Sequence, residues 1–167
     1  MSRNIILGLA TVLLAGCGPS LPDATRTAQI GTQRDASPKP AEDKVDAFHK
    51  ALAAGDTKQA LALLADDVLI YENGGAEKSK AEYAAHHLEA DMAFLKGVKQ
   101  SVVAHSARVY GEVASVMNQA KTTGTYKDKS INSASTETVV LRRIDGDWKI
   151  VHIHWSSADI KPKAPAA

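Results

Sequence analysis

Two histidines stand two positions apart near the C-terminal end of the sequence, in the stretch VHIHWSS at residues 151–157. Because alternate side chains of a β-strand lie on the same face, His152 and His154 should point the same way. Two imidazoles placed like this can bind one divalent metal ion together, or can exchange protons with a ligand near neutral pH. The spacing therefore predicts metal binding or acid–base chemistry on this strand.

A tight turn before this strand predicts which side chains face the two histidines. Asp145 and Gly146 form the strongest short-range hairpin signal in the chain. If they make a two-residue loop, the register of the flanking strands places Glu137 directly opposite His154, on the same face as His152. We therefore expect a carboxylate and two imidazoles together on one face of the sheet.

The best-marked helix of the sequence covers residues 79–97. Ser79 and Glu82 fit a capping box at its start, and Gly97 marks its end. Helical periodicity turns Glu82 and other charged side chains toward water, so the opposite face should be buried. That buried face is expected to carry the polar side chains Tyr83, His87 and Asp91, with His86 at its edge. The helix would then bring further ionisable groups toward the strand histidines.

Helices precede strands along residues 42–160, and this order is typical of an α+β domain. Glu72 ends the first expected strand beside two glycines, and we expect it at the rim of a pocket. The expected elements are a helix carrying Val45, Phe48 and Leu52 and ending at Gly55, a short helix capped by Asp56, a strand at 67–73, the helix at 79–97, and strands at 98–110, 113–126, 133–144 and 148–156.

The first residues have the layout of a bacterial export signal. One arginine precedes an apolar run too short to span a bilayer, and LAGC at residues 14–17 resembles the lipobox of bacterial lipoproteins. The resemblance implies that residues 1–16 are a signal peptide and that Cys17 is lipidated. The protein would then lie in the cell envelope, on the outer membrane facing the periplasm. Residues 17–41 are expected to be a flexible linker, and residues 161–167 a disordered tail.

Composition excludes some classes of partner. The chain has 167 residues, of which 44% are hydrophobic and 23% charged, as in ordinary globular proteins. Its formal net charge is +1, and Arg3 is the only charged residue before Cys17, so the remainder carries 19 basic and 19 acidic side chains. Because these charges balance, we expect no nucleic-acid binding, and membrane contact only through the lipid anchor.

The order of elements, together with LRRIDGDWKIVHIHWSS at residues 141–157, resembles the SnoaL-like, nuclear transport factor 2-like superfamily, also called the ketosteroid-isomerase-like fold. The resemblance covers residues 42–160. It implies a cone-shaped, curved antiparallel sheet wrapped around a long helix, with N-terminal helices and an enclosed pocket. It also implies a homodimer formed through the convex face of the sheet. The fold alone does not decide the function, because the superfamily includes enzymes and binding proteins.

The first interpretation of the pocket is a binding site for a small ligand or a transition metal. The metal would be zinc or copper, because imidazoles with a carboxylate form suitable ligand sets for both. The expected metal ligands are His87, His152, His154 and Glu137. The expected ligand-binding residues are Glu72, Tyr83, His86, His87, Asp91, Glu137, His152 and His154.

Two alternatives remain open at this stage. One is a small acid–base enzyme of the isomerase, cyclase or dehydratase type, in which a histidine and a carboxylate move a proton. The other is an inert polar network, with Glu137 paired to His154 and His87 paired to Asp91. His49 is expected to be an ordinary, partly exposed side chain rather than a ligand.

Overall fold

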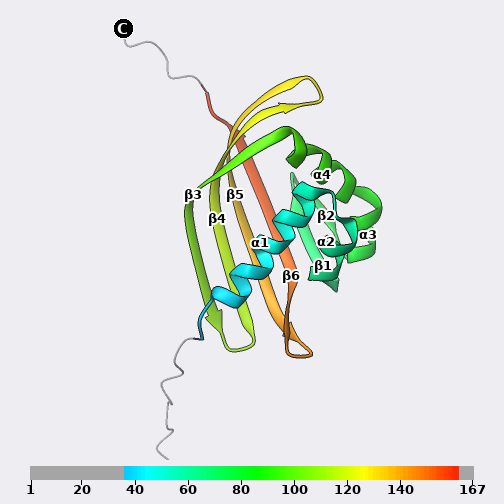
Figure 1. Ribbon diagram of the computed structural model, residues 1–167, viewed down its shortest axis with the longest axis vertical. Coiled ribbons are helices and arrows are strands. Elements are labelled where there is room, and N and C mark those ends of the chain that lie inside the picture. The colour runs from blue at the N-terminus through cyan, green and yellow to red at the C-terminus, as the bar shows by residue number, and fades with distance from the viewer. Residues whose placement is uncertain (1–35, 162–167) are drawn as a thin grey trace, which may run out of the picture. The chain divides into compact units, whose positions relative to one another are not determined.

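The computed structural model describes residues 36–161 (Figure 1). Within this range the six strands form one sheet in the order β2, β1, β6, β5, β4, β3. The elements are α1 (Lys39–Ala54), α2 (Thr57–Leu63), β1 (Leu64–Glu72), β2 (Gly75–Glu77), α3 (Lys80–His86), α4 (Leu88–Gly97), β3 (Val98–Tyr110), β4 (Val113–Tyr126), β5 (Lys129–Ile144) and β6 (Asp147–Asp159).

The α+β class and the curved sheet are confirmed, with two differences in the strands. Neighbouring strands run antiparallel except β1 and β6, which are parallel. The short strand β2 was not predicted, because three residues are too few to show an alternating pattern. Helix α1 lies across one face of the sheet, which we call the inner face (Figure 1). The opposite side is the outer face.

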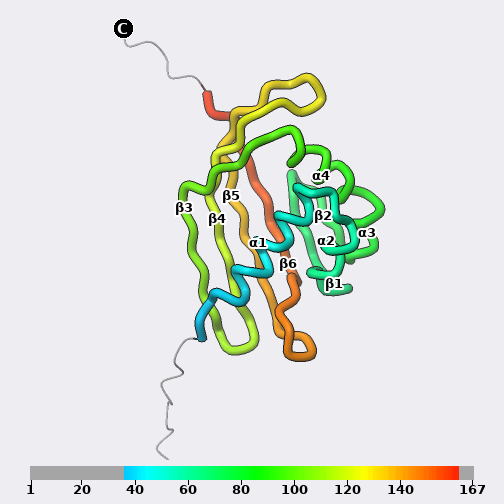
Figure 2. Tube along the Cα trace, viewed as in Figure 1, coloured from blue at the N-terminus to red at the C-terminus, as the bar shows by residue number. Residues whose placement is uncertain are grey.

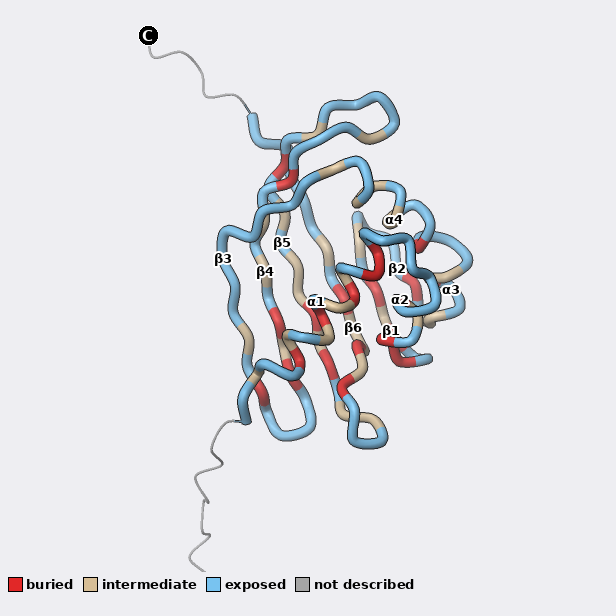
Figure 3. The backbone as a smooth tube through the Cα atoms, viewed as in Figure 1, coloured by how far each residue is buried: buried red, intermediate tan, exposed pale blue. Residues whose placement is uncertain are grey.

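The two N-terminal helices begin and end as their sequences predict. Helix α1 buries Val45, Phe48 and Leu52 against the inner face, and it ends at Gly55. Asp56 caps α2, because its side chain accepts a hydrogen bond from the backbone N–H of Gln59 at 2.9 Å. Buried residues of β4, β5 and β6 lie under α1, as Figure 3 shows. This packing forms the hydrophobic core.

A β-bulge overturns the predicted register between β5 and β6. Leu141 pairs with Ile150, as a two-residue Asp145–Gly146 loop requires, but Val140 pairs with His152, so one extra residue of β6 lies between the two pairs. Beyond the bulge Glu137 pairs with Trp155, and His154 lies on the outer face instead. The expectation that Glu137 and His154 share a face is therefore wrong.

The reason for the bulge is the burial of apolar side chains on β6. Strict alternation would place Ile150 and Ile153 on opposite faces of the strand. The extra residue turns both inward, and both are fully buried in the structure. The same shift turns Trp155 inward and the two histidines outward, so core packing decided the position of the imidazoles.

The predicted helix at residues 79–97 is divided into α3 and α4 at His87 (Figure 2). His87 has φ −114° and ψ −28°, outside ideal helical geometry, although backbone bonds from His87 to Tyr83 and from Asp91 to His87 continue across it. The break is therefore a bend within one helical path. Ser79 caps α3 as predicted, by accepting from the backbone N–H of Glu82 at 3.1 Å.

Several predictions concern residues outside the described range. The signal peptide, the lipidated Cys17 and most of the linker fall within residues 1–35, and most of the tail falls within residues 162–167. Helix α1 begins at Lys39, so the C-terminal end of the predicted linker is helical. Among the described helices, none has the length and hydropathy required to cross a membrane.

Candidate functional site

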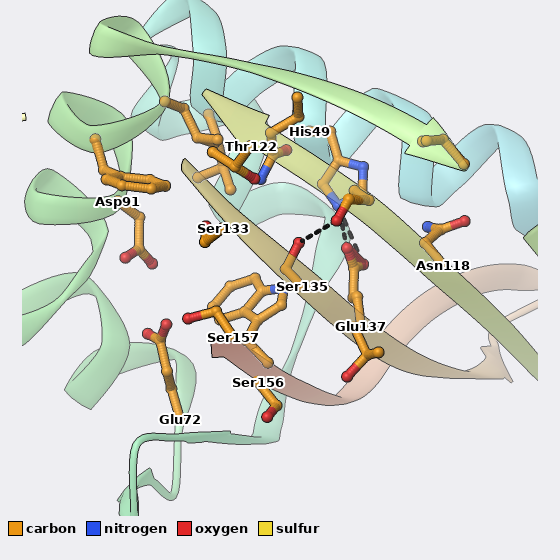
Figure 4. A pocket seen from close by; sticks show the side chains of 18 residues that line it. His49, Glu72, Asp91, Asn118, Thr122, Ser133, Ser135, Glu137, Ser156 and Ser157 are labelled. Carbon is orange, nitrogen blue, oxygen red and sulfur yellow. Dashed lines mark hydrogen bonds and ion pairs between the residues drawn. The ribbon is translucent and has the colours of Figure 1, made fainter. Parts of the chain in front are cut away.

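A cavity of about 170 Å³ lies between helices α1 and α4 and the inner face of the sheet (Figure 4). Its apolar walls include Leu52, Phe94, Leu95 and Trp155. Its polar lining residues are His49, Glu72, Asp91, Gln100, Asn118, Thr122, Ser133, Ser135, Thr136, Glu137, Ser156 and Ser157. An apolar pocket with a few converging ionisable groups is the usual form of a small-molecule site.

His49 of α1 and Glu137 of β5 form an ion pair in this cavity (Figure 4). The His49 Nε2 atom lies 2.9 Å from one carboxylate oxygen of Glu137 and 3.1 Å from the other. Burial by itself lowers the pKa of His49, but the hydrogen bond and the charge of Glu137 outweigh it, so the pKa is raised above its ordinary value. The pairing therefore favours a protonated imidazole beside a carboxylate.

Asp91 of α4 carries the second ionisable group of the cavity. Burial raises the pKa of Asp91 to about 6, although the hydrogen bond from Tyr83 partly opposes this rise. The Tyr83 hydroxyl donates to Asp91 Oδ2 at 2.8 Å, and Tyr83 itself is fully buried. The fixed phenol thus holds a carboxyl group that gains and loses its proton near physiological pH.

A smaller cavity of about 80 Å³ adjoins the first. Glu72, Asp91 and Trp155 line both cavities, so the two spaces meet at these side chains. Burial raises the pKa of Glu72. The smaller cavity also contains Glu77, whose buried carboxylate forms an ion pair with the half-exposed His87. This end of the site is therefore rich in carboxylates.

Comparison with known proteins identifies the domain. A family model described as a SnoaL-like domain matches residues 42–160. The chain belongs to the SnoaL-like domain family. The residue range predicted from the sequence resemblance agrees with this match, and no functionally curated protein matches the chain.

Solved structures of SnoaL-like and related proteins support the same fold. A protein from Shewanella frigidimarina NCIMB 400, named as a candidate ketosteroid isomerase, is 42% identical, with a TM-score of 0.67 over 70% of this chain and 94% of that chain. An NTF2-like protein of unknown function from Pseudomonas putida KT2440 is 24% identical, with a TM-score of 0.61 over 73% and 88%. A protein from Streptomyces avermitilis, named as a candidate dehydratase, is 16% identical, with a TM-score of 0.61 over 75% and 96%. The last two show the fold alone.

The SnoaL-like domain brings only some of the predicted site residues together. Glu72, Asp91 and Glu137 line the main cavity, and Tyr83 and His87 line the smaller one. His86 is exposed at the end of α3 and lines neither cavity. The predicted pairing of His87 with Asp91 is also wrong, because the bend at His87 turns its imidazole to Glu77 while Asp91 binds Tyr83.

His152 and His154 lie on the outer face, away from the cavity, because of the bulge in β6. The aromatic ring of Tyr71 meets both imidazoles edge-on, with centroid distances of 5.4 Å to His152 and 6.4 Å to His154. The His152 Nδ1 atom also lies 2.8 Å from the backbone carbonyl oxygen of Leu69, which accepts its hydrogen. These histidines therefore contact β1 instead of the site.

The predicted metal ligands consequently do not converge. His152 and His154 occupy the outer face, Glu137 the inner face, and His87 the smaller cavity. Within residues 36–161, no group of three or more His, Cys, Asp and Glu side chains has a geometry suited to a metal ion. These four side chains therefore do not form one ligand set, and zinc or copper binding stays a prediction.

His49 is an ionisable residue of the cavity that the sequence did not reveal. It follows the buried Phe48 on α1, and its partner Glu137 is 88 positions away in the chain. Helical periodicity places it beside the buried stripe but carries no information about a distant strand. The row of small hydroxyl side chains on β5, with Ser133 and Ser135 facing the cavity, was a usable signal, because small polar side chains leave space.

Asp91 is expected to make the protein less stable as the pH rises. Its pKa is about 6 in the folded protein and near the ordinary value of 3.8 in the unfolded chain, so the unfolded chain loses its proton first. The free energy of unfolding should therefore fall by about 2 kcal/mol from pH 4 to pH 7. Urea unfolding at each pH measures this loss, which should be much smaller in Asp91→Asn. Asp128→Asn, in the β4–β5 turn, is the control and should behave as the native protein does.

Proposed function

We propose that the SnoaL-like domain binds a small organic molecule in the main cavity and moves a proton on it. The observation that carries this proposal is the placement of the His49–Glu137 pair and of Asp91 in one partly apolar cavity. The cavity volume of about 170 Å³ lies below the roughly 300–1,000 Å³ range of drug-sized ligand sites, so we propose a compact substrate.

The proposed chemistry assigns separate roles to the two ends of the cavity. Asp91, with a pKa of about 6, is suited to accept a proton from a carbon acid near neutral pH. Protonated His49, held by Glu137, is suited to donate a hydrogen bond to the oxygen on which negative charge develops. Apolar side chains around them exclude water and strengthen both interactions.

One solved relative adds support by name, because the 42% identical structure is named as a candidate ketosteroid isomerase. An isomerase of this type moves a proton between carbon atoms through acid and base groups. The ionisable residues of this cavity, which are three carboxylates and one imidazole, are compatible with such chemistry.

The conversion of 3-cyclohexen-1-one to its conjugated isomer tests the proposal. A base removes a proton from the carbon between the carbonyl and the double bond, the double bond shifts, and a proton returns at the far carbon. We expect a rate above that of buffer, reduced about 100-fold or more in Asp91→Asn and in His49→Gln. Ultraviolet absorbance of the conjugated product measures the rate, and Glu112→Gln, at the exposed β3–β4 turn, is the control.

Two outcomes would count against this proposal. Binding of the ketone, seen by nuclear magnetic resonance, without any isomerisation would overturn the proton transfer and leave a binding protein. Absence of both binding and turnover, for this ketone and for a panel of compact phenols and ketones, would overturn the use of the cavity itself. An unchanged rate in both cavity variants would assign the activity to another part of the molecule.

We also propose that the domain is anchored to the bacterial envelope through Cys17, on the outer membrane facing the periplasm, and that it forms a homodimer. The export signal and the lipobox resemblance support the anchor. Exposed apolar side chains on the outer face support the dimer, with Tyr71 42%, Val113 39% and Met117 37% exposed.

Zinc or copper binding stays a prediction without support from the geometry of the described residues.

A further inference from the structure

The charges that line the main cavity are unevenly distributed. Among the described residues, the lining contains the carboxylates of Glu72, Asp91 and Glu137 but no lysine or arginine. The one basic side chain in the lining is His49, and Glu137 already binds it through both carboxylate oxygens. The remaining two carboxylates therefore face the cavity without a cationic side chain of the lining beside them.

Glu72 and Asp91 come from different elements and point toward one another at one end of the cavity (Figure 4). Glu72 ends β1, and no hydrogen bond or ion pair joins its side chain to another residue of the described range. Asp91 uses one oxygen to accept the bond from Tyr83. Oxygen atoms of both carboxylates are thus available to a ligand that donates hydrogen bonds.

The wall next to these carboxylates is aromatic and apolar. Trp155 lines both cavities together with Glu72 and Asp91, and Phe94 and Leu95 continue the apolar surface along α4. The face of an indole ring attracts a cation, and apolar side chains favour a hydrocarbon body. A ligand with a positive head and an apolar body matches both features.

We propose that the ligand of the cavity is a protonated amine with a compact apolar body, whose ammonium group binds between Glu72 and Asp91. This inference rests on the proposed function, because it names the class of molecule that the same cavity takes. An anionic ligand such as a carboxylate or phosphate is excluded by charge, since it would meet two carboxylates and no unpaired cation of the lining.

The pKa values of Glu72 and Asp91 agree with the binding of a cationic ligand at this end of the main cavity. Burial raises the pKa of both Glu72 and Asp91, and the charge of Glu72 raises the pKa of Asp91 further. The other titratable groups that face them are Tyr83, Glu77 and His87. The charge of His87, which binds Glu77, lowers the pKa values of Glu72 and Asp91 but does not cancel the rise that burial causes. An ammonium group between the carboxylates would stabilise their charged forms and lower both pKa values. Amine binding should therefore strengthen as the pH rises through about 6.

Three probes of nearly equal shape test the charge of the ligand. Calorimetric titration near pH 7.5 compares 2-phenylethylamine, which is cationic, with neutral 2-phenylethanol and anionic 3-phenylpropionate. We expect the amine to bind about tenfold or more tightly than the alcohol, and the anion to bind weakest, because hydrogen bonds to charged groups are the stronger ones. The native full-length protein is used throughout.

Matched variants locate the ammonium group. Glu72→Gln keeps the shape of the side chain. It should lower the affinity for the amine about tenfold and leave the affinity for the alcohol unchanged. Glu112→Gln removes a carboxylate whose side chain is 75% exposed on the β3–β4 turn, and it should change neither affinity. Thermal unfolding of each variant confirms that it is folded.

The outcomes separate this inference from the proposed function. If the alcohol or the anion binds as tightly as the amine, the charge class is overturned and the cavity still takes a small organic molecule. If the amine is preferred but Glu72→Gln and native protein bind it equally, the proposed position of the ammonium group is overturned. If none of the three probes binds, the amine inference is overturned, and the ketone assay decides separately whether the cavity is a ligand site.

Discussion

Truncating Tyr83 to alanine is expected to lower the free energy of unfolding by about 3–5 kcal/mol. Tyr83 is fully buried at the junction of α3 with β1, where its ring belongs to the hydrophobic core. Its removal leaves a void, and Asp91 loses the hydroxyl that donates to its carboxylate at 2.8 Å. Urea unfolding monitored by circular dichroism measures the loss.

Tyr83→Phe separates the ring from the hydroxyl. The ring remains, so we expect a loss of only about 1 kcal/mol for the missing hydrogen bond. The pKa of Asp91 should rise above its value of about 6, because the bond from Tyr83 favours the charged carboxylate. Nuclear magnetic resonance of the carboxyl carbon measures this pKa. An unchanged pKa in Tyr83→Phe would show that the hydroxyl does not bind Asp91 in solution.

Replacing Gly124 by alanine is expected to cost about 3 kcal/mol or more of the free energy of unfolding. Gly124 of β4 has φ +149°, a conformation that side chains rarely adopt. An added Cβ would lie 2.5 Å from the carbonyl oxygen of Gly97 and 2.7 Å from the Cα of Val98. Both are backbone atoms, so the end of α4 and the start of β3 would have to move away from β4.

This displacement should also reach the cavity, because α4, β3 and β4 contribute lining residues close to the contact. Phe94 and Leu95 precede Gly97, and Thr122 precedes Gly124. Gly111→Ala is the matched control, since Gly111 has φ +62° but an added Cβ would find no atom within 4 Å. We expect the control to cost about 1 kcal/mol and to leave probe binding unchanged. If both variants lose the same free energy of unfolding, the backbone conformation of glycine, and not the contact of the added Cβ with backbone atoms, determines the loss.

Local signals in the sequence predicted most of the element boundaries. Gly55 and Asp56 end one helix and begin the next as predicted, because capping depends on the residue itself and its near neighbours. The Asp145–Gly146 turn likewise forms where it was expected, and Arg143 pairs with Trp148 beside it. The Arg143 guanidinium lies over the Trp148 ring at 4.6 Å.

The same reasoning failed wherever packing between distant segments decided the outcome. The extra residue of β6 follows from the need to bury both Ile150 and Ile153 under α1, and no local pattern marks it. The bend at His87 accompanies an ion pair with Glu77, ten positions earlier on β2. The bulge places His152 and His154, and the bend places His87, at positions that differ from those predicted by regular strand and helix periodicity.

The sequence by itself therefore determined the class of fold and the order of elements, because periodicity and capping act over a few neighbouring residues. Three of the carboxylates that it singled out, Glu72, Asp91 and Glu137, line the main cavity. Only the tertiary structure decided that His49, and not His154, is the partner of Glu137. The choice depends on which side chains the curved sheet and α1 bring within hydrogen-bond distance. A one-residue shift in strand register is enough to exchange one histidine for another.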